Sequence, residues 1–316
     1  MRVSERADAR PERGATAAGR ALGRGPDRRS GWPWREVPVF DFHARLAPRP
    51  GATDRLLSTM DGCGIARAAV CAGGTVDLVR LSRQLVEGGH VDSDPDNDAV
   101  LQACAGSGGR LVPFYFANPR RGAEPYRRRA PDYAGLEISP AVHGLDLTDP
   151  RTAELVAVAA AAGHPVYVVC LERPGSRVAD LAALAGRFPG VPFVLGHSGV
   201  GNIDFYGVEL VAPVPNILLE TSGGYTSVLR AALDRLTPAR VLFGTEFPLQ
   251  HPSVELAKFA ALDLPADQWR QVGWDNAHRL LGQQPAGPPA AGPPAAGPLT
   301  EGSTRDADRH PAAAAR

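Results

Sequence analysis

Several side chains that can carry acid–base chemistry follow short apolar runs of this sequence. Asp41, His43 and Arg45 alternate in the run Val-Phe-Asp-Phe-His-Ala-Arg-Leu, and His197 follows Val-Leu-Gly. Side chains two apart in a strand point the same way, so the first three are expected to share one face. Glu246 ends the run Val-Leu-Phe-Gly-Thr-Glu. A carboxylate placed there is costly to bury unless it meets a proton, a cation or a metal. Glu246 therefore predicts a functional site.

The residue types set the chemistry that this site can perform. An imidazole or a carboxylate can act as general base toward water or a substrate proton. The guanidinium of Arg45 can hold a carboxylate or carbonyl oxygen, but it has no lone pair for a metal. Structural roles stay open beside these. Asp41 is expected to be a hydrogen-bond acceptor at the strand end, His43 can be a satisfied interior histidine, and Arg45 can pair with Asp41 or Glu137.

Expected strands and helices alternate along the middle of the chain. Eight strands separated by helices predict a distorted (β/α)8 barrel of the TIM type, in which the chemistry lies at the carboxyl ends of the strands. A doubly wound open sheet is less favoured, because no Gly-rich phosphate turn follows the first strand. The strands are expected at 37–42, 66–71, 111–116, 135–138, 165–170, 191–195, 216–220 and 241–243, and the helices at 53–63, 97–105, 150–162, 178–187 and 227–236.

Composition limits the classes of partner. The 316 residues are 44% hydrophobic, enough for one large domain with tails, and the formal net charge is +0. That balance argues against a nucleic acid or an anionic membrane as the main partner. The partner expected from the site residues is a small-molecule substrate. No apolar run approaches the ~20 residues of a membrane span, and no secretory signal is found. Four cysteines without a CxxC pair predict reduced thiols in a cytoplasmic protein.

Both ends of the chain differ in composition from the middle. Residues 1–35 are polar and rich in Arg and Gly, and residues 284–316 contain an imperfect Pro-Ala-Gly repeat. Neither segment can bury a core, so both are expected to be disordered tails. The folded domain is expected to span residues 36–283.

Short motifs recur along the whole expected domain: Asp-x-His at 41–43, Asn-Asp at 97–98, Gly-Leu-x-Ile-x-Pro at 135–140, Leu-Gly-His-Ser-Gly at 195–199, Leu-Glu-Thr-Ser-Gly-Gly at 219–224, Leu-Phe-Gly-Thr-Glu-Phe-Pro at 242–248 and Asn-Ala-His-Arg-Leu-Leu-Gly at 276–282. In these motifs the chain resembles the amidohydrolase-related family, amidohydrolase family 2. The resemblance implies a distorted (β/α)8 barrel that often forms dimers. It also implies hydrolysis of an amide, ester or lactone, or non-oxidative decarboxylation, usually with one zinc or manganese ion.

The departures from the family pattern fall at its metal and substrate positions. Only His43 and His197 keep the identity that the resemblance implies. Arg45 stands in place of the second His of the opening motif, and Glu246 stands in place of the Asp of strand eight. Glu137 and Ser139 take the positions of the Lys and His of strand four. The position of the strand-five His falls at Val169 or Cys170.

These departures lead to the hypothesis that an Arg45–Glu246 ion pair replaces the metal. A stable zinc site generally needs three protein donors plus water. A guanidinium next to the metal position would repel a metal ion and attract the carboxylate. No metal is therefore expected, although zinc or manganese is compatible with the resemblance. A bound ion would have His43, His197 and Glu246 as ligands.

The expected activity is hydrolysis of a small polar lactone, ester or amide. A lactone fits a site without a metal best, because its carbonyl needs less activation than that of an amide. Two alternatives stay open: a non-oxidative decarboxylase of a carboxylated aromatic, and an inactive barrel that serves as a binding protein. The candidate catalytic residues are Glu246, His197 and His43, and the candidate substrate-binding residues are Arg45, Glu137, Ser139 and Tyr225.

Overall fold

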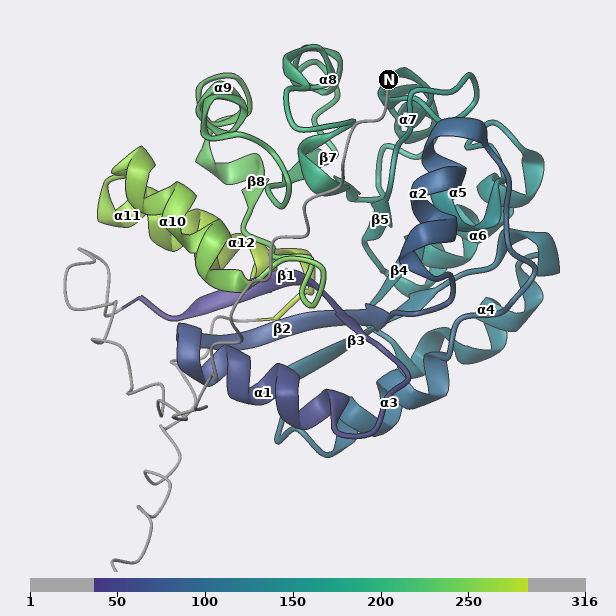
Figure 1. The fold of residues 1–316 in the computed structure, drawn as a ribbon. Helices are drawn as coiled ribbons and strands as arrows, with labels where there is room; N and C mark the ends of the chain where they lie inside the picture. The colour runs from purple at the N-terminus through teal and green to yellow at the C-terminus, as the bar shows by residue number, and fades with distance from the viewer. Residues whose placement is uncertain (1–36, 284–316) are drawn as a thin grey trace, which may run out of the picture. The chain divides into compact units, whose positions relative to one another are not determined.

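Eight parallel strands form a nearly closed barrel in the computed structural model, which describes residues 37–283 (Figure 1). The predicted barrel is thereby confirmed, whereas the predictions for the two tails lie outside the described residues. Each strand pairs with its neighbour in chain order. The strands are β1 Val39–Leu46, β2 Ile65–Ala72, β3 Leu111–Phe116, β4 Gly135–Ile138, β5 Val166–Val168, β6 Phe193–Leu195, β7 Ile217–Glu220 and β8 Val241–Leu242.

Contacts between β1 and the segment after β8 bring the two ends of the sheet together. The backbone N–H of Phe42 donates to the carbonyl of Phe243 over 2.8 Å, and that of Arg45 donates to Phe247 over 2.7 Å. The N–H of Glu246 donates to the carbonyl of His43 over 2.8 Å. The first and last site motifs of the chain are therefore neighbours in space.

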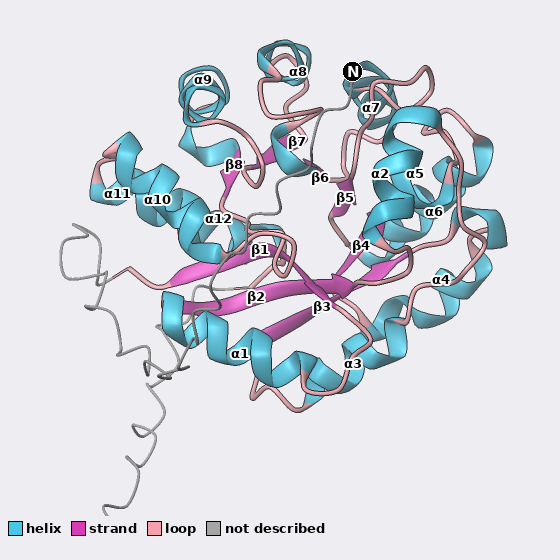
Figure 2. Ribbon diagram, in the orientation of Figure 1, coloured by secondary structure: helices cyan, strands magenta, loops and turns pink. Residues whose placement is uncertain are grey.

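Helices surround the strands (Figure 2). Local signals set several of their ends. In α6, Asp149 caps the first turn with a hydrogen bond to the N–H of Arg151, Pro150 takes the first position, and Gly163 ends the helix with φ 71°. None of the helices between residues 37 and 283 has the length and apolarity that crossing a bilayer requires. The helices are α1 Ala52–Cys63, α2 Leu78–Glu87, α3 Asn97–Ala105, α4 Glu124–Arg129, α5 Pro140–His143, α6 Pro150–Ala162, α7 Val178–Arg187, α8 Phe205–Val211, α9 Thr226–Leu236, α10 Pro252–Leu262, α11 Ala266–Arg270 and α12 Asn276–Leu280.

Large apolar side chains fill the interior of the barrel. The rings of Phe42 and Phe114 meet edge to face with centroids 5.6 Å apart. Tyr167, Val194 and Leu218 bring β5, β6 and β7 into the same buried cluster. Each such buried side chain stabilises the fold by about 1.5–3 kcal/mol relative to its exposed state. This packing holds the strand ends, and hence the polar residues on them, in fixed positions.

A β-bulge in β1 changes which of its side chains face the interior. The register with β2 shifts between Asp41 and Ala44. Phe42 belongs to the interior cluster, and yet the next side chain, His43, stacks on the interior ring of Tyr167. A bulge re-aims the side chains that follow it. The expectation that Asp41 shares a face with His43 and Arg45 is therefore wrong, because strict alternation is interrupted between them.

Candidate active site

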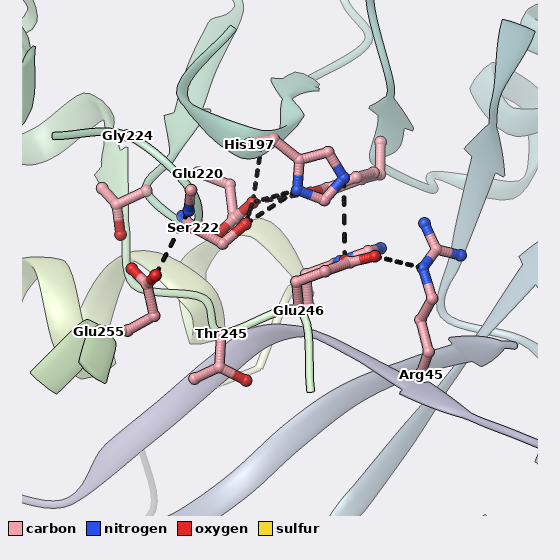
Figure 3. A network of polar contacts seen from close by, with 12 residues as sticks. Arg45, His197, Glu220, Ser222, Gly224, Thr245, Glu246 and Glu255 are labelled. Atoms are coloured by element: carbon pink, nitrogen blue, oxygen red, sulfur yellow. Dashed lines mark hydrogen bonds and ion pairs between the residues drawn. The ribbon is translucent and has the colours of Figure 1, made fainter. Parts of the chain in front are cut away.

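Five of the predicted site residues meet at the carboxyl ends of the strands. His43 and Arg45 come from β1, Glu137 from β4, His197 from the turn after β6, and Glu246 from the segment after β8. The centroids of the two imidazole rings are 5.4 Å apart. Glu246 lies between Arg45 and His197 (Figure 3). Residues as far apart in the sequence as His43 and Glu246 thus form one cluster.

The guanidinium of Arg45 lies between two carboxylates. Its Nε donates to Oε1 of Glu246 over 2.7 Å. Its Nη2 and Nη1 donate to the two oxygens of Glu137 over 2.7 and 3.2 Å, a bidentate arrangement. The side chain of Arg45 is 17% exposed and that of Glu137 is fully buried. Burial disfavours both charges, but each stabilises the other, so the pKa of Arg45 rises well above its usual value and that of Glu137 falls to about 2.

His43 is the second cation of the cluster. Its Nδ1 forms an ion pair with Oε2 of Glu246, and its Nε2 lies 3.4 Å from Oε2 of Glu137. Burial favours the neutral ring, but the charge of Glu246 and the hydrogen bonds with Cys71 and Glu137 together outweigh burial and raise the pKa of His43 well above 6.5. The ring stacks on Tyr167 with centroids 4.0 Å apart and planes 2° from parallel. Burial opposes the charge of Glu246 too, but Arg45 and His43 hold its pKa well below the usual value.

Arg45, His43, Glu137 and Glu246 form a charge quartet. Two cations face two anions, so the quartet is neutral as a whole. Removing one member would leave its partners buried and uncompensated, which is strongly unfavourable.

His197 differs from the quartet because solvent reaches it and its charge is not stabilised. The side chain is 25% exposed, and the backbone has φ 57° inside the tight turn after β6. Burial lowers the pKa of His197 below 6.5, and Glu246 only partly offsets this. Its Nε2 lies 3.8 Å from Oε2 of Glu246, beyond hydrogen-bond distance. His197 is therefore a neutral imidazole at neutral pH.

Glu220, a buried carboxylate that the sequence analysis did not single out, binds the backbone of His197 and the hydroxyl next to its imidazole. Oε2 of Glu220 accepts a hydrogen bond from the Tyr167 hydroxyl over 2.7 Å and from the His197 backbone N–H over 3.0 Å. It also accepts one from the Ser222 hydroxyl over 2.9 Å, and this hydroxyl lies 2.9 Å from Nδ1 of His197. The position of Glu220 at the last residue of β7, within the Leu-Glu-Thr-Ser-Gly-Gly motif, was the available signal.

Asp41 has a structural role, as expected. Its carboxylate accepts hydrogen bonds from the backbone N–H groups of His43 and Thr245 and from the Thr245 hydroxyl over 2.5 Å. Burial raises the pKa of Asp41 to about 7, against the effect of Thr245. These bonds tie β1 to the segment that carries Glu246.

Ser139 and Tyr225 stand apart from the quartet. Ser139 is buried at the start of α5, where its carbonyl accepts from the N–H groups of Val142 and His143. Tyr225 is 56% exposed at the start of α9. Among the described residues, neither side chain forms a hydrogen bond or ion pair with the quartet. Their predicted role in substrate binding stays a prediction.

The cysteine next to the quartet is Cys71 rather than Cys170. Cys71 lies within reach of His43 and Glu137, and burial raises the pKa of its thiol to about 12. Burial also raises the pKa of the Cys170 thiol, and the charges that add to this effect are those of Asp204 and Asp180 rather than those of the quartet. Both thiols are protonated and unreactive at neutral pH.

Two groups of three side chains have the spacing of metal ligands: His43, His197 and Glu246, and His43, Cys71 and Glu137. Their other contacts compete with a metal ion for the same donor atoms. Arg45 and His43 already bind the oxygens of both carboxylates, and the Cys71 thiol is protonated. In the first group, Nδ1 of His43 and Oε2 of Glu246 form an ion pair with each other, whereas a zinc site generally needs three protein donors. A divalent ion would also add two positive charges to a buried cluster that is already neutral.

Comparisons with known proteins agree with the fold. The sequence model of the amidohydrolase family matches residues 41–283. The structure resembles a manganese-bound 5-carboxyvanillate decarboxylase from Novosphingobium aromaticivorans, with TM-score 0.58, 14% identity, and coverage of 78% of this chain and 96% of the other.

Two further solved structures show the same similarity. A putative 2-pyrone-4,6-dicarboxylic acid hydrolase from Pseudomonas putida gives TM-score 0.59 at 16% identity, covering 78% and 98% of the two chains. A 2,6-dihydroxybenzoate decarboxylase from Rhizobium gives 0.57 at 16%, covering 78% and 99%. A search of curated proteins found no match. At these identities the similarity shows a shared fold, and the chemistry must be argued from the site.

Proposed function

Since the chain belongs to the amidohydrolase family, whose model matches residues 41–283, we propose that it is an enzyme that hydrolyses a small polar lactone or ester without a bound metal ion. The observation that carries the proposal is the Arg45 guanidinium, which bridges Glu137 and Glu246 beside a neutral, accessible His197. Arg45 supplies the fixed positive charge, and His197 supplies the base.

His197 is the general base. Its lowered pKa keeps the ring neutral at neutral pH, and 25% of the side chain is exposed. A neutral imidazole can take a proton from water as the water oxygen attacks the carbonyl carbon of the substrate. When the tetrahedral intermediate breaks its bond to the leaving oxygen, the imidazolium returns this proton to the leaving alkoxide. The products are a carboxylic acid and an alcohol, joined in one molecule when the substrate is a lactone.

Arg45 stabilises the negative charge that develops on the carbonyl oxygen. Nη2 donates one N–H to Glu137, and no acceptor for its second N–H is found in the described part of the chain. The quartet fixes this group in position before substrate binds, and fixed donors in a dry site are the effective ones. Glu246 holds both Arg45 and His43 in place and lies 3.8 Å from Nε2 of His197. Its negative charge favours the imidazolium that forms during catalysis.

A second candidate is non-oxidative decarboxylation of a carboxylated aromatic. The observation in its favour is that His43 is a buried imidazolium beside Arg45. One cation could hold the carboxylate while the other donates a proton to the ring carbon. Both ring nitrogens of His43 face carboxylates, however, and these carboxylates hold its protons. His43 is therefore a weaker candidate for a proton donor than the neutral His197 is for a general base. An inactive barrel that binds a small molecule is the third candidate.

A substrate panel separates these candidates. The purified chain is assayed with lactones, activated esters and carboxylated aromatics, recording acid release in one arm and carbon dioxide release in the other. Hydrolysis predicts acid release without carbon dioxide. His197→Ala should lower kcat/KM by about 10²- to 10⁴-fold, the usual contribution of a general base. Glu246→Gln should also lower it strongly. His90→Ala, on a half-exposed histidine paired with Asp92, is the control.

The proposal fails if carbon dioxide is the product, or if an observed hydrolysis survives both His197→Ala and Glu246→Gln. Tight binding of a panel compound without turnover would support the binding-protein candidate instead.

A further inference from the structure

The contacts of Glu220 determine its role as an acceptor. Oε1 accepts from the backbone N–H of Ser222 over 2.6 Å, and Oε2 accepts from the backbone N–H of His197 and from the Tyr167 hydroxyl. Backbone N–H groups can only donate, so both oxygens of this fully buried side chain act as acceptors.

The Ser222 hydroxyl lies between this acceptor and the base. It is 2.9 Å from Oε2 of Glu220 and 2.9 Å from Nδ1 of His197. A serine hydroxyl has one proton, which it donates to the carboxylate. Toward His197 it can then only accept, so Nδ1 of the imidazole must carry the hydrogen.

We propose that Glu220 and Ser222 are positioning residues that fix His197 as the tautomer protonated on Nδ1, so that the lone pair of Nε2 faces Glu246 and the substrate. This inference rests on the proposed function, because the base needs its lone pair on the nitrogen that is directed toward Glu246. In the opposite tautomer Nε2 would carry a hydrogen and could not accept a proton from water. The groups that face His197 are Glu220 from β7, Glu246 after β8, and His43 and Arg45 from β1.

The surrounding chain leaves little room for another arrangement. A methyl group at Gly244 would lie 2.1 Å from Oε1 of Glu220, and one at Gly196 would lie 2.5 Å from the Tyr167 hydroxyl. These glycines allow the carboxylate and the phenol to reach their places. From α10, Glu255 accepts from the N–H of Gly223, which holds the loop that carries Ser222.

Nuclear magnetic resonance of the imidazole nitrogens tests the inference directly. In the 15N-labelled full-length chain at mildly alkaline pH, correlations between ring nitrogens and carbon-bound ring protons identify the protonated nitrogen of each histidine. The chain has eight histidines, so His197 is assigned by the signals that disappear in His197→Gln. We expect Nδ1 of His197 to be protonated and Nε2 to be unprotonated. The reverse tautomer in the unmodified chain would overturn the proposal.

Variants then test the two positioning residues. Ser222→Ala should give the Nε2-protonated tautomer or a mixture and lower kcat/KM by about 10- to 100-fold, by analogy with the loss of the partner that orients a metal-binding imidazole. Ser222→Thr keeps the hydroxyl and should restore the single tautomer. Ser198→Ala is the matched control, since the neighbouring Ser198 hydroxyl is buried without a hydrogen-bond partner among the described residues.

The outcomes separate this inference from the proposed function. An unchanged tautomer in folded Ser222→Ala would overturn the inference, and if that variant does not fold, the unmodified chain and Ser222→Thr still decide it. The expected tautomer together with no hydrolysis of any panel compound would support the inference and contradict the proposed function. The spectra need no substrate, so the two results are independent.

Discussion

Nε of Arg45 donates a hydrogen bond to Oε1 of Glu246 over 2.7 Å, although 201 positions separate the two residues in the sequence. The contact exists because β1 lies next to the segment that follows β8. Arg45 occupies the position where the resemblance to the family implies a metal-binding histidine. The same guanidinium also binds Glu137, so one side chain neutralises two buried carboxylates.

Removal of this cation should destabilise the protein. Arg45→Met leaves Glu137 and Glu246 buried without a full counter-charge, and breaking a buried pair in this way costs about 3–5 kcal/mol. The free energy of unfolding, measured by urea denaturation, should fall by that amount. The matched control is Arg83→Met, which breaks the exposed pair with Glu87 and should change it by about 0.5 kcal/mol at most. Equal effects of the two variants would contradict a central role for Arg45.

The dependence of the rate on pH follows from His197. Because the folded protein lowers the pKa of His197, the base is already unprotonated at neutral pH. The value of kcat/KM for hydrolysis should therefore be constant around pH 7 and fall only below pH 6.5, the ordinary pKa of histidine. A pH–rate profile of the free enzyme measures this. A rise of kcat/KM that continues above neutrality would exclude His197 as the base.

Stability in acid should depend on Glu137. The pKa of this carboxyl falls from 4.5 to about 2 on folding, so its pairing with Arg45 stabilises the fold fully above pH 4.5. This contribution is lost as the pH falls from 4.5 toward 2. In Glu137→Gln, the free energy of unfolding should vary less with pH across this window than in the unmodified chain. Glu124→Gln, at an exposed carboxylate paired with Arg127 and Arg128, is the control, and an equal effect of the two variants would contradict the role of Glu137.

Space for the Glu220 carboxylate depends on Gly244. The added methyl group of Gly244→Ala would lie within 2.1 Å of Oε1 of Glu220. Overpacking of this kind typically costs about 1–3 kcal/mol, which thermal or urea denaturation would detect. Gly186→Ala is the control, because nothing lies within 4 Å of its methyl position in α7 and alanine should stabilise that helix by up to about 1 kcal/mol. A neutral Gly244→Ala would show that the carboxylate is not held tightly.

Local signals made much of the fold predictable. The expected ranges 97–105, 150–162 and 178–187 coincide with α3, α6 and α7, and 111–116 and 135–138 with β3 and β4. Helix α2 was not predicted, although Leu78, Leu81 and Leu85 repeat at helical spacing. In the structure most of its apolar side chains face solvent, whereas Gln84 is buried. Its exposed apolar residues are Leu78, Val79, Leu85 and Val86.

The predictable part of the site consists of residues at strand ends. His43, Arg45, Glu137, His197 and Glu246 could be placed together because parallel strands of a barrel present their carboxyl ends at one face. Two features could not be predicted.

The first is the β-bulge that removes Asp41 from the face of His43, since the sequence between them alternates regularly. The second is Tyr167. It lies in the middle of β5, which ends at Val168, whereas the resemblance pointed to Val169 or Cys170. The predicted end of this strand, residue 170, lies two residues beyond the observed end, and an error of this size is enough to point to a different side chain.

The metal content of the purified chain tests the central claim most directly. The chain is expressed in medium supplemented with zinc and manganese, dialysed, and measured by elemental analysis, with Arg45→His as the comparison because it adds an imidazole and removes the guanidinium. We predict no stoichiometric zinc or manganese in the unmodified chain and unchanged activity after treatment with a chelator. One tightly held ion per unmodified chain, with activity lost on its removal, would contradict the account.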